Sequence, residues 1–137
     1  MIEVQNISKA FNNVQVLKDI NVLFEKGKTN LIIGQSGSGK TVLLKSIVGL
    51  HDVDVGKIIF DDIVFNELNF KDKKEMRKQI GMLFQGGALF DSATVEENVM
   101  YPLDKFINFY FNDNKDRVNE GLRRVNMINT NRRYPAE

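Results

Sequence analysis

The 137-residue sequence contains no cysteine, and it has only two prolines and one histidine. The lack of cysteine excludes disulfide bonds and thiolate chemistry, and it fits a reducing compartment. The net charge is +1, so bulk electrostatics favour neither nucleic acid nor an anionic membrane as a partner. No apolar run approaches the length of a membrane span, and the start has no signal-peptide character. We therefore expect a soluble cytoplasmic domain.

The composition that is present is ordinary for a globular protein, with 42% apolar and 27% charged residues. Alternating apolar residues predict strands over residues 2–7 and 20–24, with a turn at Asn12-Asn13 between them. The stretches "TNLIIG" at 29–34 and "IGMLF" at 80–84 are apolar on both faces, which is typical of strands in a buried parallel sheet. The pattern indicates an α/β fold with additional antiparallel strands.

Helical signals lie between and after these strands. Apolar spacing predicts a helix over 42–50, and the charged stretch 69–79 predicts a loop and a short helix. Thr94 followed by two glutamates predicts a capped helix through Met100 that stops near Pro102. A further amphipathic helix is predicted from apolar positions spaced four, three and three apart: Val118, Leu122, Val125 and Ile128. Pro135 suits the first turn of another helix, with Glu137 near its positive end; the same residues also fit a single proline in a frayed tail.

The segment "GQSGSGKT" at 34–41 matches the phosphate-binding pattern G-x-x-x-x-G-K-[ST] without exception. Glycines at 34, 37 and 39 let the loop curl so that backbone N–H groups point at phosphate oxygens. The helix after the loop adds its N-terminal dipole, Lys40 can reach the β- and γ-phosphates, and the Thr41 hydroxyl can ligate Mg²⁺. An apolar strand before the loop and an amphipathic helix after it support nucleotide-phosphate binding.

An acidic residue at a strand end is the other part that a self-contained P-loop enzyme requires. The run "KIIFDD" offers Asp61 or Asp62 as a Walker B carboxylate. The same residues also fit a hairpin turn between "KIIF" and "IVF", and we favour the turn. For His51, which follows a predicted helix end, we expect a solvated or capping role.

The segment "GQSGSGKTVLLKSIVGL" resembles the Walker A segment of ABC transporter ATPases, and "IGMLFQ" resembles their Q-loop strand. The longer stretch "MLFQGGALFDSATVEENVMYPL" resembles the ATPase subunits of Mla-type (MCE-associated) phospholipid transporters. The resemblance implies a P-loop NTPase with a RecA-like core, an N-terminal antiparallel β subdomain and the start of a helical subdomain. Residues 1–137 would form the N-terminal part of one nucleotide-binding domain, with the β subdomain and P-loop core over about 1–87 and the helical subdomain from about 88 to 137.

The resemblance also implies roles for individual residues. Phe11 would stack on adenine with Val16 beside it, although without the resemblance Phe11 would be expected in the core. Gln85 would contact Mg²⁺ and the attacking water and sense the transmembrane partner; otherwise it is a polar residue that ends a strand. Lys40 and Gln85 would be catalytic, and Thr41 and Gln85 would hold the metal. The predicted ATP-binding residues are Phe11, Val16, Gly34, Gln35, Ser36, Gly37, Ser38, Gly39, Lys40, Thr41 and Val42.

The partners implied by the resemblance are ATP, Mg²⁺, a second ATPase subunit in a homodimer and a transmembrane permease. Residues 88–100 would face the permease, and "FINFYF" at 106–111 would join that surface or pack inside the helical subdomain. The protein would be cytoplasmic and held at the inner face of the cell membrane through the permease. No nucleic acid partner is expected.

The sequence departs from the family pattern in one small and one large respect. Asp61-Asp62 stands where the family often has Asp-Gly. More importantly, "YPAE" at 134–137 would be followed in the family by the LSGG-type signature, the Walker B aspartate, the catalytic glutamate and the switch histidine. We therefore expect the N-terminal part of an ATPase subunit that binds ATP without efficient hydrolysis. The alternatives are a non-catalytic nucleotide-binding or assembly fragment that self-associates through exposed strand edges, or a compact P-loop kinase or GTPase that uses Asp61.

Overall fold

The computed structural model describes the backbone of residues 1–106 and 111–137. The chain forms two compact units, Met1–Gly81 and Met82–Glu137, which we call the sheet unit and the helix unit. The predicted role of "FINFYF" at 106–111 falls on side chains outside the described set. Among the described residues, no helix combines the length and apolar character that crossing a bilayer requires.

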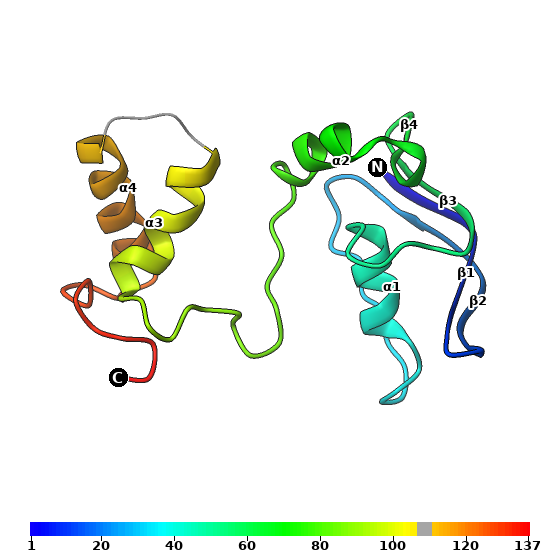
Figure 1. Cartoon of the computed structure of the whole chain (residues 1–137), viewed down its shortest axis with the longest axis horizontal. Helices are drawn as coiled ribbons and strands as arrows, with labels where there is room; N and C mark the ends of the chain where they lie inside the picture. Colours follow the sequence, from blue (N-terminus) through cyan, green and yellow to red (C-terminus); the bar gives the residue numbers. More distant parts are fainter. Residues whose placement is uncertain (107–110) are drawn as a thin grey trace. The chain divides into compact units, whose positions relative to one another are not determined.

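The sheet unit contains one antiparallel sheet and two helices (Figure 1). Its elements are β1 (Ile2–Phe11), β2 (Val14–Phe24), α1 (Lys40–Ile47), β3 (Val55–Phe60), β4 (Ile63–Val64), the 3₁₀ turn η1 (Phe65–Glu67) and α2 (Phe70–Arg77). The strand order is β2-β1-β3-β4, so β1 is central, and Val4 lies opposite both Val22 and Ile58. The predicted additional antiparallel strands are therefore confirmed.

Two predicted turns join these strands. Asn12 and Asn13 both have positive φ, 48° and 65°, as the tight β1–β2 hairpin requires. Asp61 also has positive φ, 49°, and with Asp62 it connects β3 to β4. The interpretation of Asp61-Asp62 as a hairpin turn is confirmed. The Asp61 carboxylate pairs with the N-terminal ammonium group of Met1 at 2.7 Å, and this bond lowers the pKa of Asp61.

Helix α1 packs on one face of the sheet and supplies part of its core. The buried apolar residues of this core come from four elements of the sheet and turn region and from α1: Val4, Ile7, Leu17, Leu43, Ile47, Ile58 and Phe65. The C-terminus of α1 is closed by α2, because Arg77 donates from Nε to Val48 O (3.0 Å) and from Nη2 to Gly49 O (2.6 Å). The predicted helices over 42–50 and within 69–79 are thus present, the first beginning two residues earlier and ending at Ile47.

The two predicted parallel strands are not formed in this structure. Residues 29–34 and 80–84 have no strand pairing, and Leu31, Ile33 and Leu83 are 82%, 81% and 92% exposed. A parallel strand needs hydrogen-bonded neighbours, and its apolar faces need covering helices. None of the described segments pairs with either stretch, so the prediction of strands at 29–34 and 80–84 is wrong for this structure.

The helix unit consists of α3 (Val95–Phe106) and α4 (Phe111–Arg124), packed through Met100, Val118 and Leu122. The predicted cap of α3 is confirmed, since Glu97 N donates to Thr94 Oγ1 (3.3 Å) and Thr94 N donates to Glu97 Oε2 (2.7 Å). The predicted stop near Pro102 is wrong, because α3 continues to Phe106. Proline removes one helical hydrogen bond, but the apolar face of α3 packed on α4 offsets that loss.

The predicted amphipathic helix is correct for Val118 and Leu122 but too long. Helix α4 ends at Arg124, where Asn126 takes a positive φ of 60° and Met127 N donates to Leu122 O (2.9 Å) in a Schellman-type closure. Val125 and Ile128 are therefore outside the helix, 63% and 64% exposed. No helix begins at Pro135; instead Glu137 N donates to Tyr134 O (3.0 Å) in a turn.

Candidate functional site

The loop between residue 34 and α1 is closed by glycine backbone geometry. Gly37 and Gly39 have φ values of 79° and 92°, which other residues rarely adopt. Gly39 is the N-cap of α1, its carbonyl accepts from Leu43 N (2.8 Å), and no side chain caps this helix end. The first N–H groups of α1 therefore have no intrahelical acceptor and form a site suited to an anion.

The Lys40 ammonium group lies inside this loop. Its Nζ donates to Gly34 O (2.8 Å) and Gln35 O (2.6 Å), and it lies 3.5 Å from Ser38 Oγ. Within the described part of the chain, no carboxylate pairs with Lys40. The loop thus surrounds a cation whose charge is not neutralised by the protein, which is the electrostatic requirement for binding a phosphate.

The other predicted residues of the loop are placed around this cation. Gln35, Ser36 and Ser38 are exposed, and Thr41 is exposed in the first turn of α1, where its hydroxyl can reach a bound cation. Val42 is half-buried, and its side chain packs against the core of the sheet unit. Its predicted contact with ATP remains a prediction. Among the described residues there is no group of three or more histidine, cysteine or acidic side chains that could hold a metal ion.

Val16 is brought to the loop by close packing between β2 and Gly39. A Cβ added at Gly39 would lie 3.1 Å from Val16 O, 3.1 Å from Leu17 Cδ2 and 3.3 Å from Val16 Cγ1. A side chain at position 39 would therefore push the loop away from β2. This contact places Val16 against the phosphate loop; its predicted place beside Phe11 at the adenine remains a prediction.

Phe11 lies at the end of β1 and is 39% exposed, so the alternative expectation that it is a core residue is wrong. The Lys9 ammonium lies over its ring, 5.3 Å from the centroid, and the His51 ring meets it in a T-shaped contact at 5.3 Å. His51 is half-buried, so its side chain is not fully solvated, whereas the expected capping role fits its backbone, because His51 N donates to Lys45 O (3.3 Å) after the end of α1. Sequence reasoning missed Lys9 because nothing local predicts its contact with Asp54, 45 residues later.

Gln85 lies in the helix unit, in an exposed turn. Gly87 N donates to Phe84 O (3.0 Å), and Gly86 has a φ of 88°, so a β-turn places Gln85 and Gly86 at its two central positions. The positive φ of Gly86 is the backbone conformation that the second central position of this turn requires, and glycine adopts it without strain. The predicted metal contact of Gln85 remains a prediction.

A lysine enclosed by a glycine-rich loop at the N-terminus of a helix, on an α/β scaffold, defines the chain as a P-loop protein. Residues 17–137 match the family model described as ABC transporter, and the chain belongs to that family. The predicted fold class is confirmed by solved structures: the dimeric bacterial ABC transporter cassette MJ0796 superposes with a TM-score of 0.90 at 27% identity, covering 99% of this chain and 62% of that one. A second structure of that cassette, in a post-hydrolysis state bound to ADP and Pi, gives 0.88 at 26% identity, with coverage of 99% and 62%.

Curated relatives carry transport names. The chain is 38% identical to the phosphonates import ATP-binding protein PhnC of Lactobacillus johnsonii over 93% of its length, and 40% identical to the methionine import ATP-binding protein MetN of Clostridioides difficile over 77%. It is 33% identical, over 99% of its length, to the probable ribonucleotide transport ATP-binding protein mkl of Mycobacterium tuberculosis. The chain spans only 53%, 33% and 38% of these three relatives. None of these names refers to phospholipid.

Proposed function

We propose that this chain supplies the ATP-binding part of an ABC transporter ATPase subunit that powers transport. The observation that carries the proposal is the Lys40 ammonium, enclosed by the loop carbonyls of Gly34 and Gln35 beside the uncapped start of α1. When phosphate enters, Lys40 exchanges these carbonyl contacts for charge-assisted bonds to the β- and γ-phosphate oxygens. The backbone N–H groups of residues 36–41 then bind the remaining oxygens.

We assign the other predicted site residues to the adenine base and to Mg²⁺. Phe11 offers exposed aromatic surface for the adenine base, and Val16 lies against the loop at Gly39. The exposed Thr41 hydroxyl and the Gln85 amide are the oxygen donors that we assign to Mg²⁺, which when bound neutralises charge on the β- and γ-phosphates. We keep the proposed division of roles, with residues 1–87 binding nucleotide and 88–137 beginning the helical subdomain.

Hydrolysis needs more than phosphate binding, because a water molecule must be oriented and deprotonated. Residues 1–137 contain no LSGG-type signature, and the acidic residues considered for Walker B, Asp61 and Asp62, follow the antiparallel strand β3 in a hairpin turn. Asp61 is committed to a hairpin turn and to the Met1 ammonium group, so a kinase or GTPase built on Asp61 is not supported. We therefore expect residues 1–137 to bind ATP without steady turnover.

A calorimetric titration with ATP and Mg²⁺ tests the proposal. Lys40→Ala is expected to weaken binding about tenfold or more, since bonds to a charged partner are worth about 1.5–3 kcal/mol each. Lys45→Ala, one turn further along α1, removes the same charge from the same helix and should leave the affinity unchanged. Equal losses in the two variants, or no heat with the unaltered chain, would overturn the proposal. Steady ATP turnover abolished by Lys40→Ala would overturn the expected lack of hydrolysis.

We further propose that the partners are a transmembrane permease and a second ATPase subunit, and that the transported molecule is a phospholipid or related lipid. The lipid assignment rests on the resemblance of residues 82–103 to Mla-type subunits; the names of the relatives make methionine, phosphonates and ribonucleotides the competing cargoes. The exposed Leu89 and Phe90 lie in the segment that would face the permease at the inner side of the cell membrane. Cross-linking from position 90 to a co-expressed permease would test this surface.

A specific observation favours self-association as a second property of this chain. Leu31 and Ile33 are more than four-fifths exposed on an extended segment without strand partners, and β2 is an open edge of the sheet. Such edges pair readily with another chain. Light scattering should show an average molecular mass that rises with protein concentration, and Leu31→Lys should have a lower average mass than the unaltered chain at the same concentration. A constant monomer mass across a wide concentration range would contradict it.

A further inference from the structure

The ring of Phe11 is held by a group of side chains that phosphate binding does not use. Lys9 Nζ lies 5.3 Å from the ring centroid, over the ring. The imidazole of His51 approaches the same ring at 5.3 Å between centroids, with an interplanar angle of 74°. Phe11 therefore has two neighbours that restrict its side chain, while 39% of its surface remains exposed.

Lys9 is itself fixed by Asp54. The Asp54 carboxylate accepts from Lys9 Nζ (2.7 Å) through one oxygen and from Ala10 N (2.7 Å) through the other. The pKa of Asp54 is lowered chiefly by the bond from Lys9 and then by the bond from Ala10 N, so the carboxylate is ionised at neutral pH. The Lys9 side chain is only 15% exposed, which is unusually low for a lysine. The ammonium group is thus positioned over Phe11 rather than free in solvent.

His51 is positioned by the backbone at the end of α1. The backbone N–H of His51 donates to Lys45 O (3.3 Å), and the same carbonyl accepts from Leu50 N (2.8 Å). Residue 51 therefore follows the helix in a fixed turn. Three residues later, Asp54 N donates to Ser8 O (3.0 Å) and joins this segment to β1. The segment 51–54 therefore supplies both the imidazole that contacts Phe11 and the carboxylate that fixes Lys9.

We propose that Lys9 and His51 are positioning residues that hold the Phe11 ring ready to stack on the purine base of a nucleotide. This inference rests on the proposed function, in which Phe11 binds adenine. Restricting the ring before binding lowers the conformational entropy that base stacking would otherwise cost. A cation over the ring and an aromatic partner beside it are each worth enough to keep one rotamer populated.

The test separates base recognition from phosphate recognition by comparing ATP with inorganic tripolyphosphate, both with Mg²⁺, on the whole 137-residue chain. His51→Ala should weaken ATP binding about two- to tenfold, the range expected for losing one aromatic pair, and leave tripolyphosphate binding unchanged. His51→Phe keeps an aromatic ring and should restore most of the ATP affinity. In a Phe11→Ala background, His51→Ala should have no further effect, because it acts through the ring.

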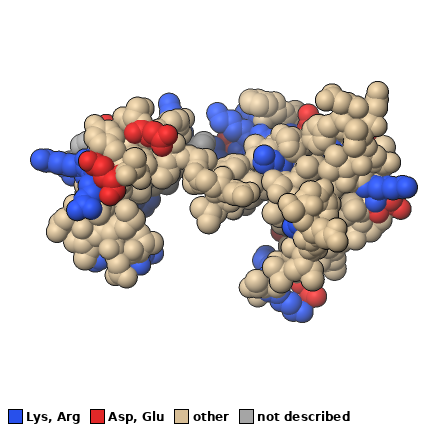
Figure 2. Space-filling view, turned by 90° about the horizontal axis from the view of Figure 1, so that it is seen from below, with Lys and Arg blue, Asp and Glu red and all other residues tan. Residues whose placement is uncertain are grey.

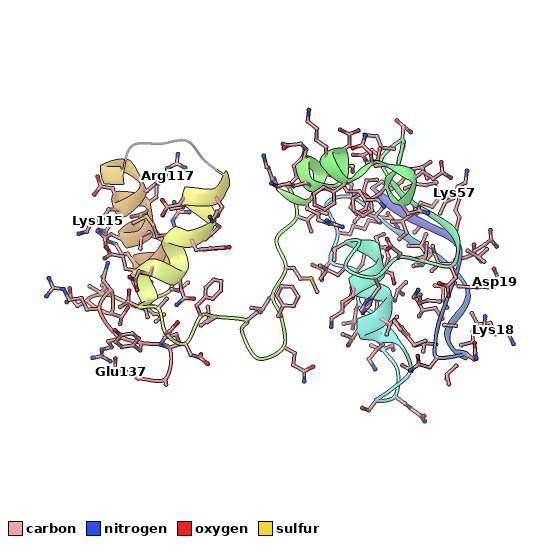
Figure 3. The ribbon with its side chains drawn as sticks, in the orientation of Figure 1. Lys18, Asp19, Lys57, Lys115, Arg117 and Glu137 are labelled. Atoms are coloured by element: carbon pink, nitrogen blue, oxygen red, sulfur yellow. The ribbon has the colours of Figure 1, made fainter. Side chains whose placement is uncertain are left out.

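Lys9 gives a second, independent variant. Lys9→Met retains the aliphatic stem but removes the cation, and we expect the same selective loss for ATP. Lys18→Met is the matched control: Lys18 lies on the neighbouring strand β2 and projects outward from the sheet (Figure 3). It should change neither affinity.

The outcomes distinguish failure of the positioning role from failure of ATP binding itself. Unchanged ATP affinity in both His51→Ala and Lys9→Met, or equal losses for ATP and tripolyphosphate, would overturn the positioning role while ATP binding through Lys40 stands. Failure of the unaltered chain to bind ATP or tripolyphosphate would overturn the proposed function and this inference together. Thermal unfolding of each variant identifies a loss of affinity that is only a loss of folded protein.

Discussion

The sheet unit and the helix unit are stabilised in different ways. In the sheet unit, seven buried apolar side chains from distant parts of the sequence meet, and β1 is paired on both sides. In the helix unit, the buried apolar cluster among the described residues has three members: Met100, Val118 and Leu122. On the face shown in Figure 2, basic and acidic side chains are intermingled, so charge does not distinguish the two units there. The difference lies in apolar burial.

In the helix unit, hydrogen bonds also close the start of α3. The first two free N–H groups of α3 are bound by main-chain oxygens, with Val95 N donating to Arg133 O (2.8 Å) and Glu96 N to Asn131 O (3.0 Å). Asn98 Nδ2 lies within 3.1 Å of the carbonyl oxygens of Phe90, Ala93 and Thr94. The sheet unit therefore depends mainly on its buried apolar core, whereas the helix unit depends also on the hydrogen bonds around the start of α3, which we call its polar closure. Each unit should respond to a different perturbation.

Gly56→Ala should give the largest effect, and it should be confined to the sheet unit. Gly56 has a φ of 96°, and a Cβ there would lie 2.4 Å from Gln5 O and 2.5 Å from Asn6 O, both backbone atoms of β1. Backbone strain and overpacking together should cost about 2–6 kcal/mol. Hydrogen exchange followed by mass spectrometry should show lost protection in β1 and β3, with α3 and α4 unchanged.

The matched control is Gly27→Ala, where φ is also positive, 74°, but no heavy atom lies within 4 Å of the added Cβ. Only the conformational cost remains there, about 1 kcal/mol. If Gly56→Ala lowers protection equally in both units, the two units do not unfold separately and the comparison fails.

Leu122→Ala should have the next largest effect, and it should destabilise the helix unit while leaving the sheet unit unchanged. Leu122 is 5% exposed in the small cluster between α3 and α4, and its truncation should cost about 2–3 kcal/mol, at the low end for such changes because few neighbours surround it. Tyr101 and Tyr134 belong to the helix unit, residues 1–81 contain no tyrosine, and the sequence has no tryptophan. Tyrosine fluorescence during urea unfolding therefore reports on this unit.

Leu89→Ala removes the same side chain from a position that is 56% exposed, and it should shift the transition by no more than about 0.5 kcal/mol. An effect of Leu122→Ala as small as that of Leu89→Ala would show that the α3–α4 cluster contributes little.

The sequence allowed most of the local structure to be predicted, because the signals are local. The Asn12-Asn13 turn, the Asp61-Asp62 turn and the Thr94 cap each depend on residues within a few positions of one another. The phosphate loop was predictable for the same reason, since loop, lysine and helix start occupy eight consecutive residues.

What the sequence could not predict depends on contacts between distant segments. The strands expected at 29–34 and 80–84 have the right apolar pattern but no ladder, and whether a partner strand exists is not encoded in the pattern itself. The continuation of α3 through Pro102 depends on packing against α4. At the candidate site, the contacts of Lys9 and His51 with Phe11 join residues up to 40 positions apart, so no motif could have identified them.

Thr94→Ala tests the polar closure that characterises the helix unit. The Thr94 hydroxyl accepts from Glu97 N (3.3 Å), and replacing such a cap by alanine typically costs about 1 kcal/mol. The urea transition seen by tyrosine fluorescence should shift accordingly, while protection in β1 and β3 stays constant. Ser92→Ala, an exposed hydroxyl two residues earlier, should leave the transition in place. A matching shift in the two variants would assign the effect to the loop and not to the cap.

The smallest effect should come from lowering the pH, through the Glu97 carboxylate that bonds to Thr94 in the same cap. The pKa of Glu97 is lowered by hydrogen bonds from Thr94 N and then from the Thr94 hydroxyl, so folding favours the ionised carboxylate. Its contribution to stability is therefore complete above the ordinary glutamate pKa, about 4.3, and is lost as pH falls through the lower folded value. Glu97→Gln keeps an acceptor for Thr94 N but cannot titrate, so the difference between its urea midpoint and that of the unaltered chain should narrow between about pH 6 and pH 3. Asp91→Asn removes an exposed carboxylate from the neighbouring loop and should not reproduce this narrowing. A Glu97→Gln midpoint that runs parallel to that of the unaltered chain throughout this window would show that the carboxylate charge is irrelevant to the closure of α3.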